Sequence, residues 1–165
     1  MKPIPSPPGS GLGVPDPAVE PQTLALERFV PYRLSVLTNT VSRAIARLYD
    51  DRFGLSIPEW RVMAALGRYG RLTASEICGV TAMDKVQVSR AVGRMERRKL
   101  VRRVDDATDR RRRPLSLTRT GAGVYAEIVP LALEQEARLL TALDAAEFRA
   151  LDRLLQKLQA QAATL

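Results

Sequence analysis

The chain has 165 residues, of which 45% are hydrophobic and 27% charged, a composition typical of a globular protein that buries a core without disulfides. One cysteine and no histidine exclude an intramolecular disulfide, Ser-His-Asp or Cys-His catalysis, and metal sites built on histidine or clustered cysteine. The net charge of +8 predicts an anionic partner.

The basic excess is confined to one segment. Residues 83–119 contain thirteen lysines and arginines against five acidic residues, so they carry the whole net charge of the chain. A neutral body with one strongly basic segment is typical of a polyanion-binding protein. The alternative is a solvated charged face without a partner.

Residues 1–22 are predicted to form a disordered tail. Residues 1–21 hold seven of the eleven prolines and three of the ten glycines, without helical or strand periodicity. An arm that reaches DNA is the alternative, but Lys2 is the only cation in this stretch. We therefore favour the tail.

Residues 23–54 are predicted to form an N-terminal dimerisation helix. Pro31 suits the first turn of a helix, and Gly54 suits its end. Between them, apolar residues recur at three- and four-residue spacing, as on one face of a helix. These apolar positions are Leu34, Leu37, Val41, Ile45 and Leu48.

Three shorter helices are predicted next. Residues 56–59 and 73–76 are capping boxes, and each opens a helix. Asp84 is a good N-cap for the third helix, which we expect to run to Lys99 with basic residues on its outer face. Gly79 is expected at a tight turn between the second and third helices. This pattern predicts a helix-turn-helix motif.

A β-hairpin is predicted to follow. Residues 100–104 and 114–118 alternate apolar and polar side chains, as strands do, and the polar segment between them is rich in arginine. Residues 70–72 could add a short third strand. Residues 55–118 are therefore predicted to form a winged helix-turn-helix DNA-binding domain.

Residues 119–165 are predicted to form two C-terminal dimerisation helices. Thr118 or Thr120 caps the first helix, which runs to about Leu140, and Asp144 opens the second. The last helix carries a seam typical of a coiled coil, formed by Phe148, Leu151, Leu155 and Leu158. Packing within one chain is the alternative to a dimer interface. The fold class is thus mainly α with a small β wing.

This arrangement resembles the MarR family of bacterial transcription regulators over about residues 26–161. The resemblance is carried by IPEWRV at 57–62, LTASEI at 72–77, MDKVQVSR at 83–90, DATDRR at 106–111 and LSLT at 115–118. It implies a homodimer of two winged helix-turn-helix lobes joined by helices. Such proteins bind pseudo-palindromic operators on double-stranded DNA, usually repress, and in many cases release DNA when a small ligand binds.

The DNA contacts are expected on the helix that enters the major groove and on the wing. Amide, guanidinium and methyl groups there can pair with adenine, guanine and thymine, and hydroxyls at the preceding helix start can bind phosphate. The residues expected to contact DNA are Thr73, Ser75, Lys85, Val86, Gln87, Ser89, Arg90, Arg94, Arg110, Arg111, Arg112 and Arg113.

Among the wing arginines, the resemblance points to Arg111 or Arg110 as the side chain that enters the minor groove, with Asp109 as its partner. Arg112 and Arg113 depart from the family pattern, in which apolar residues commonly follow. Which arginine enters the groove therefore stays open, and phosphate contacts alone are the alternative.

A ligand site is suggested where the family's pocket lies, near the first two helices. Tyr32, Arg33, Asn39 and Trp60 fall there, and an arginine beside two aromatic rings would suit a small aromatic carboxylate or a phenol. The alternatives are a core role for Trp60 and a surface role for Arg33. Cys78 is expected to be a small structural residue rather than a redox sensor.

The predicted function is therefore a homodimeric, ligand-released transcriptional repressor that is not an enzyme and has no cofactor or metal. The alternative is a constitutive or architectural DNA-binding protein without an effector. The sequence contains no apolar run near the roughly 20 residues of a membrane helix and no secretory signal, so we expect the protein in the cytoplasm.

Overall fold

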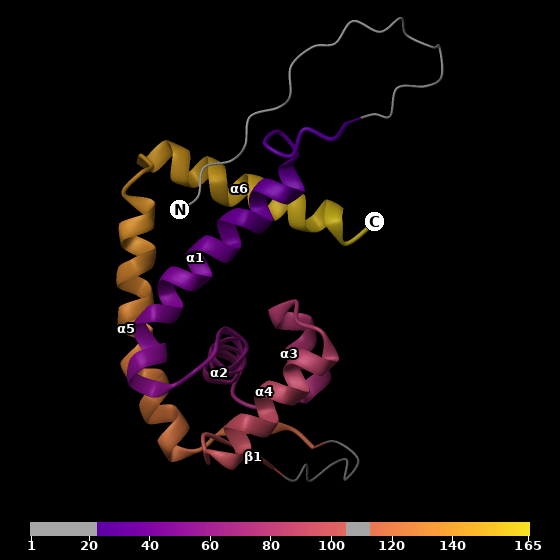
Figure 1. Cartoon of the computed structure of the whole chain (residues 1–165). Helices are drawn as coiled ribbons and strands as arrows, with labels where there is room; N and C mark the ends of the chain where they lie inside the picture. The colour runs from indigo at the N-terminus through magenta and orange to yellow at the C-terminus, as the bar shows by residue number, and fades with distance from the viewer. Residues whose placement is uncertain (1–22, 105–112) are drawn as a thin grey trace, which may run out of the picture. The chain divides into compact units, whose positions relative to one another are not determined.

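A computed structural model describes residues 23–104 and 113–165 of the chain. The described residues fall into two compact units, a first unit of residues 23–36 and a second unit of residues 37–104 and 113–165, so α1 contributes to both. Figure 1 shows α2, α3, α4 and β1 of the second unit gathered into one group. The described elements in chain order are α1 (Val30–Phe53), α2 (Ile57–Tyr69), α3 (Ala74–Thr81), α4 (Lys85–Arg97), β1 (Val101–Arg103), β2 (Leu115–Leu117), α5 (Arg119–Leu140) and α6 (Ala145–Ala162).

The fold is mainly helical with a small antiparallel sheet, as the sequence predicts. β1 pairs with β2 in the register Val101↔Leu117, Arg102↔Ser116 and Arg103↔Leu115. The expected third strand is reduced to a single bridge between Leu72 and Leu115. The strand cannot extend further because the residue after Leu72, Thr73, is already the N-cap of α3.

Local capping chemistry sets most helix starts. Thr73 and Glu76 form a capping box at the start of α3, and Asp144 and Glu147 form another at α6. The Thr118 hydroxyl caps α5 by accepting a hydrogen bond from the Gly121 N–H at 3.0 Å. These side chains satisfy backbone donors that the helices themselves leave unpaired. The predicted starts of these helices are therefore confirmed.

The turn of the helix-turn-helix motif differs from the prediction. Gly79 lies inside α3, where an added Cβ would meet open space, so the turn predicted there is wrong. The left-handed residue is instead Ala82, with a φ of 52°. Met83 follows it directly and is buried in the core. We attribute the position of the turn to this burial, which offsets the roughly 1–2 kcal/mol that a left-handed alanine costs.

α4 is shorter than expected. α4 ends at Arg97, and Lys99 adopts a φ of 57°, so the predicted end at Lys99 is wrong by two residues. The chain must reverse here because the Leu100 and Val101 side chains, next in sequence, are buried at the start of β1.

One apolar core holds the second unit together. Among the described residues, α2 and α4 together contribute seven of its fifteen buried side chains, more than any other pair of elements. Burial of each large apolar side chain stabilises the fold by roughly 1.5–3 kcal/mol. The core thereby fixes the base of the wing against the helix-turn-helix motif. Its buried members are Tyr49, Leu55, Val62, Met63, Leu66, Ile77, Met83, Val88, Ala91, Val92, Met95, Leu100, Val101, Leu115 and Ile128.

The C-terminal helices contrast with this core. α6 has no buried side chain, and α5 buries only Gly121 and Ile128. Large apolar side chains on both helices remain exposed in the single chain, namely Leu133, Leu139, Phe148, Leu151, Leu154, Leu155 and Leu158. No helix in residues 23–104 and 113–165 is long and apolar enough to cross a membrane.

Candidate nucleic-acid interface

α4 has two chemically distinct faces. Val88, Ala91, Val92 and Met95 are buried in the core, at the three- and four-residue spacing of one helix face. The other face is exposed, and its side chains carry amide, hydroxyl, ammonium and guanidinium groups. The exposed residues at the start of α4 are Lys85, Val86, Gln87, Ser89 and Arg90.

The N-terminus of α4 is organised by Asp84. Its carboxylate accepts a hydrogen bond from the Gln87 N–H at 2.7 Å, and the Gln87 side-chain oxygen lies 3.4 Å from the Asp84 N–H. The second of these bonds is long and therefore weak. The Gln87 amide can consequently leave it at small cost and turn outward, away from the helix end.

The start of α3 places the two predicted phosphate contacts at a helix N-terminus. Ser75 is exposed. The Thr73 hydroxyl is engaged within the protein, because it donates to a Glu76 side-chain oxygen at 2.9 Å and accepts from the Glu76 N–H at 3.3 Å. Thr73 thus has a structural role at the cap whether or not it also meets phosphate.

Arg94 has an intramolecular partner. Its Nε lies 3.3 Å from a carboxylate oxygen of Glu59, whose side chain is 4% exposed. Burial by itself raises the pKa of Glu59, but hydrogen bonds from the Ser56 hydroxyl and N–H and the charge of Arg94 outweigh it, so the pKa lies below its usual value. Glu59 is therefore a carboxylate at neutral pH, and Arg94 supplies its counter-charge.

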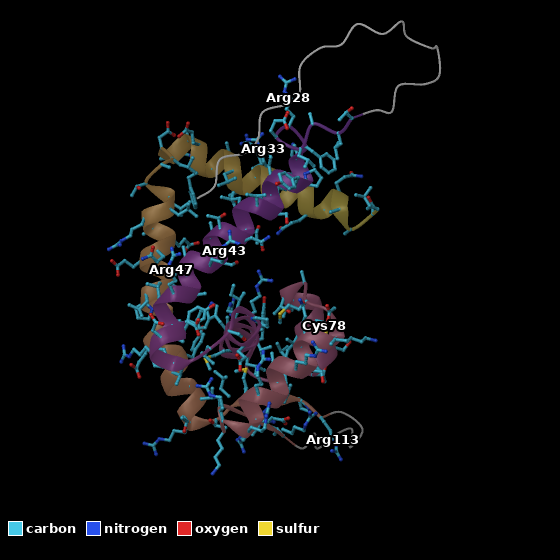
Figure 2. The ribbon with its side chains drawn as sticks, in the orientation of Figure 1. Arg28, Arg33, Arg43, Arg47, Cys78 and Arg113 are labelled. Carbon is cyan, nitrogen blue, oxygen red and sulfur yellow. The ribbon has the colours of Figure 1, made fainter. Side chains whose placement is uncertain are left out.

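The base of the wing carries further cations. Arg102 and Arg103 are exposed on β1, and Arg103 pairs with Glu96 at 3.0 Å. Arg113, labelled in Figure 2, is exposed just before β2. The predictions for Asp109, Arg110, Arg111 and Arg112 fall outside the described residues.

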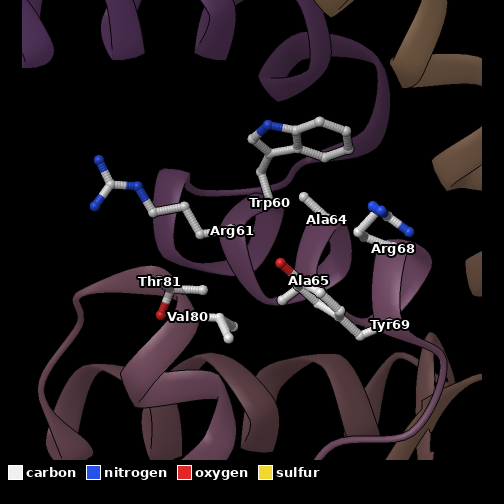
Figure 3. A pocket seen from close by; sticks show the side chains of 8 residues that line it. All are labelled: Trp60, Arg61, Ala64, Ala65, Arg68, Tyr69, Val80 and Thr81. Atoms are coloured by element: carbon white, nitrogen blue, oxygen red, sulfur yellow. The ribbon is translucent and has the colours of Figure 1, made fainter. Parts of the chain in front are cut away.

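A pocket of about 350 Å³ opens between α2 and the end of α3. Figure 3 shows Arg61 and Thr81 on one side and Arg68 and Tyr69 on the other. Two guanidinium groups near aromatic rings can bind a planar anion, by ion pairing and by stacking. The lining residues are Trp60, Arg61, Ala64, Ala65, Arg68, Tyr69, Val80 and Thr81.

Trp60 takes part in both the pocket and the aromatic packing behind it. Its ring centroid lies 5.5 Å from that of Tyr49 and 6.2 Å from that of Tyr125. Burial raises the pKa of Tyr49 to about 12, although the positive charge of Arg61 acts in the opposite direction. Trp60 can therefore pack against the core and line the pocket at the same time.

The other predicted ligand residues are not part of this pocket. Tyr32, Arg33 and Asn39 are exposed on α1, and none of them lines it in the described structure. Arg61, Arg68 and Tyr69 were missed by sequence reasoning. The signal was present, because Arg61 and Arg68 stand seven residues apart and so share one helix face. Cys78 is half-buried and packs against the core.

Sequence comparison relates this geometry to known proteins. The sequence pattern of the MarR family matches residues 53–112. The transcriptional regulator HosA of Escherichia coli O127:H6 is 31% identical over 113 residues, which cover 68% of this chain and 84% of HosA. The chain belongs to the MarR family. It is therefore a DNA-binding transcriptional regulator, as its members are, and not an enzyme.

Solved structures of MarR-family proteins share the fold. A MarR/EmrR family regulator from Acinetobacter sp. ADP1 matches with a TM-score of 0.80 and 26% identity, covering 86% of this chain and all of that one. BpsR of Bordetella bronchiseptica, whose DNA binding is regulated by 6-hydroxynicotinic acid, matches with a TM-score of 0.72 and 25% identity, covering 83% of this chain and 97% of BpsR. The winged helix predicted from the sequence is thereby confirmed.

Proposed function

We propose that this MarR-family protein is a homodimeric repressor that reads a pseudo-palindromic operator with α4 and is released by a small aromatic acid or phenol. One observation carries the DNA-reading part of this proposal. The polar residues at the start of α4 are exposed on a helix whose opposite face is anchored in the core. A rigidly held helix with free polar side chains is what sequence reading in the major groove requires.

The exposed side chains of α4 have the chemistry to distinguish bases. Gln87 can bond adenine through its amide, and Lys85 or Arg90 can donate to guanine. Val86 is 56% exposed, and its methyl groups suit contact with a thymine methyl. Ser89 suits a phosphate or a base edge, and Thr73 and Ser75 suit phosphate at the start of α3.

The wing is proposed to reach the neighbouring minor groove. Arg111 or Arg110 would enter a narrow groove, where the negative potential is strongest. Arg112 and Arg113 would then meet phosphates. These contacts would add to the salt dependence of binding without reading bases.

Dimerisation is supported by the exposed apolar side chains of the C-terminal helices. Leu151, Leu155 and Leu158 on α6 are 38%, 39% and 49% exposed in the single chain. Exposed apolar side chains at the spacing of one helix face mark an interaction site, and a symmetric operator matches a symmetric protein. We therefore assign these residues to the contact with a second copy.

Release by a ligand is supported by the pocket between α2 and α3. Its two arginines and two aromatic side chains suit a planar aromatic anion, and the related BpsR is regulated by a compound of that class. A ligand here would contact the two helices that precede α4, within the proposed DNA-binding domain. We propose that the protein acts in the cytoplasm, where operator DNA is accessible.

Selection of bound sequences from a random DNA library tests the reading of DNA. We expect enrichment of a pseudo-palindrome whose half-sites are about one helical turn apart, bound by two chains. Equal affinity for selected and random DNA at the same salt concentration would instead indicate an architectural protein.

A thermal-shift screen of benzoates, cinnamates, pyridine carboxylates and phenols tests the effector. Because coupling between two sites is reciprocal, a ligand that releases operator DNA must also bind less tightly to the DNA complex. Specific DNA binding that no screened compound weakens would count against release by the screened compounds.

A further inference from the structure

A polar network ties the middle of α4 to the start of α2. The Glu59 carboxylate accepts hydrogen bonds from the Ser56 N–H, at 2.9 Å, and from the Ser56 hydroxyl. Arg94 completes the network, with Nε 3.3 Å from the other Glu59 oxygen and Nη2 3.2 Å from the Ser56 Oγ. A single guanidinium thus joins α4 to both polar groups of the α2 capping box.

The hydrogen bonds and the ion pair of this network depend on the orientation of the groups that form them, whereas apolar packing is not directional. Val88, Ala91, Val92 and Met95 hold α4 against the core, and the hydrophobic effect that drives this packing has no preferred direction. The ion pair adds a directional constraint to that packing. The Glu59 end of the ion pair is buried, whereas the Arg94 side chain is 43% exposed. An ion pair with a buried, hydrogen-bonded member has a narrow geometry, and the best-attested contribution of such pairs is to set register rather than to add stability. Arg94 is therefore placed to fix how α4 is rotated and how far it projects.

The position of Arg94 on α4 connects this network to the DNA-facing residues. Arg90 stands four residues earlier and is exposed, so the two arginines project from neighbouring points on one helix face. A rotation of α4 that broke the Arg94–Glu59 pair would also move Arg90 and Gln87. Arg94 and the two DNA-facing residues are thus coupled because they lie on the same helix.

We propose that Arg94 is a positioning residue for operator recognition, which sets the orientation of α4 through Glu59 and Ser56 instead of acting through a phosphate contact of its own. This inference rests on the proposed reading of DNA by α4. It assigns Glu59, an acidic residue, to the support of binding to a polyanion.

The two roles of Arg94 predict opposite effects of Glu59→Gln. If Arg94 bound phosphate, neutralising Glu59 would release the guanidinium and remove a negative charge, so DNA binding would tighten. If Arg94 positions α4, Glu59→Gln loosens the orientation of the helix and weakens binding to the selected operator. Random DNA, which needs no base contacts, would be bound as tightly as before or more tightly.

The test measures operator and random-DNA affinity of the full-length protein across a salt series for Glu59→Gln, Arg94→Gln and Arg94→Lys. We expect each to lower the ratio of operator to random-DNA affinity by about tenfold or more, with the salt slope unchanged. Lysine should not restore binding, because it keeps the charge but lacks the two separate, fixed donor atoms, Nε and Nη2, that reach Glu59 and Ser56. The concentration of binding-competent protein is first determined for each variant by titration with excess DNA. Partial unfolding of a variant then lowers this concentration but does not change the measured affinity.

Arg97→Ala is the matched control. Arg97 also lies on α4, and its Nε bonds only to the Gly93 carbonyl of the same helix, at 3.3 Å, among the bonds that the structure describes. Its removal costs one charge and should leave the affinity ratio unchanged. The double variant Glu59→Gln/Arg94→Gln should lose no more than either single variant, because both act on one network.

Several results would overturn the proposal. They are tighter operator binding by Glu59→Gln, a fall of about one in the salt slope for Arg94→Gln, or full rescue by Arg94→Lys. If Glu59→Gln fails to fold, the salt slope of Arg94→Gln and the affinity of Arg94→Lys still distinguish the two roles of Arg94. Failure of the wild-type protein to select any operator would count against the proposed function instead, before any variant is compared.

Discussion

Gly121 on α5 lies against the backbone carbonyl of Leu100, so closely that a Cβ at Gly121 would overlap the carbonyl oxygen. The Thr118 N–H donates to the same carbonyl at 3.0 Å, and the Thr118 hydroxyl donates to Lys99 O at 2.6 Å. The start of α5 is therefore docked on the residues that lead from α4 into the wing. Only glycine permits this approach, because the opposing atoms belong to the backbone and cannot turn aside.

Gly121→Ala should consequently destabilise the protein by about 1–3 kcal/mol or more, since the clash requires α5 to move. Gly123→Ala is the matched control two residues later, where a Cβ would meet open space. It should stabilise the helix by up to about 1 kcal/mol. Urea unfolding of both variants measures the difference. Equal stability of the two variants would show that α5 can shift freely against Leu100.

Gln87→Ala should weaken binding to the selected operator by about 1–3 kcal/mol and leave the salt slope unchanged, because a neutral amide reads bases without releasing counterions. The base preference at one operator position should relax at the same time. Gln156→Ala is the control, because Gln156 lies on α6 and bonds Asp152 of its own helix. An equal loss of affinity on all DNA sequences would indicate that Gln87 contacts the DNA backbone instead of a base.

Arg111→Ala should weaken operator binding by about 1–3 kcal/mol if this side chain enters the minor groove. The loss should be larger on operators with A·T-rich flanks, whose grooves are narrow. Arg113→Ala should instead lower affinity similarly on all sequences and reduce the salt slope by about one. If Arg110→Ala shows the groove-dependent loss and Arg111→Ala does not, the assignment moves by one residue.

Arg61→Gln and Arg68→Gln should each weaken binding of a 6-hydroxynicotinic acid probe, or of an aromatic acid found by screening, by about tenfold or more, because hydrogen bonds to a charged group are worth about 1.5–3 kcal/mol. Calorimetric titration of the DNA-free protein measures this directly. Arg138→Gln, which removes an exposed pair with Glu134 on α5, should have no effect. Unchanged binding in both pocket variants would place the effector elsewhere.

Tyr49 should make the stability depend on pH in the alkaline range. Burial raises its pKa to about 12 from 10.0, so the folded state disfavours the phenolate. The stability that this provides is complete below pH 10 and is lost as the pH rises from there toward 12. The free energy of unfolding of Tyr49→Phe should fall less over this range. Tyr69→Phe, at an exposed position, should behave like the wild type, and identical curves for all three proteins would contradict the assignment.

Much of the fold follows from local chemistry that the sequence displays. Thr73–Glu76 and Asp144–Glu147 are capping boxes within four residues, and they open helices for the same reason in any context. The apolar spacing of Val88, Ala91 and Met95 likewise predicts which face of α4 is buried. The basic segment and the motifs around it were sufficient to recognise the family.

Tertiary structure decided what depends on residues far apart in the chain. Arg94 and Glu59 are 35 positions apart, and only the packing of α4 on α2 brings the guanidinium to the buried carboxylate. Packing also places the turn at Ala82, and not at Gly79 as the sequence predicts. It likewise brings Arg61 and Arg68 of α2 together with Val80 of α3 in one pocket. Such contacts arise because burial in a shared core is a non-local energy, whereas capping and periodicity act within a few residues.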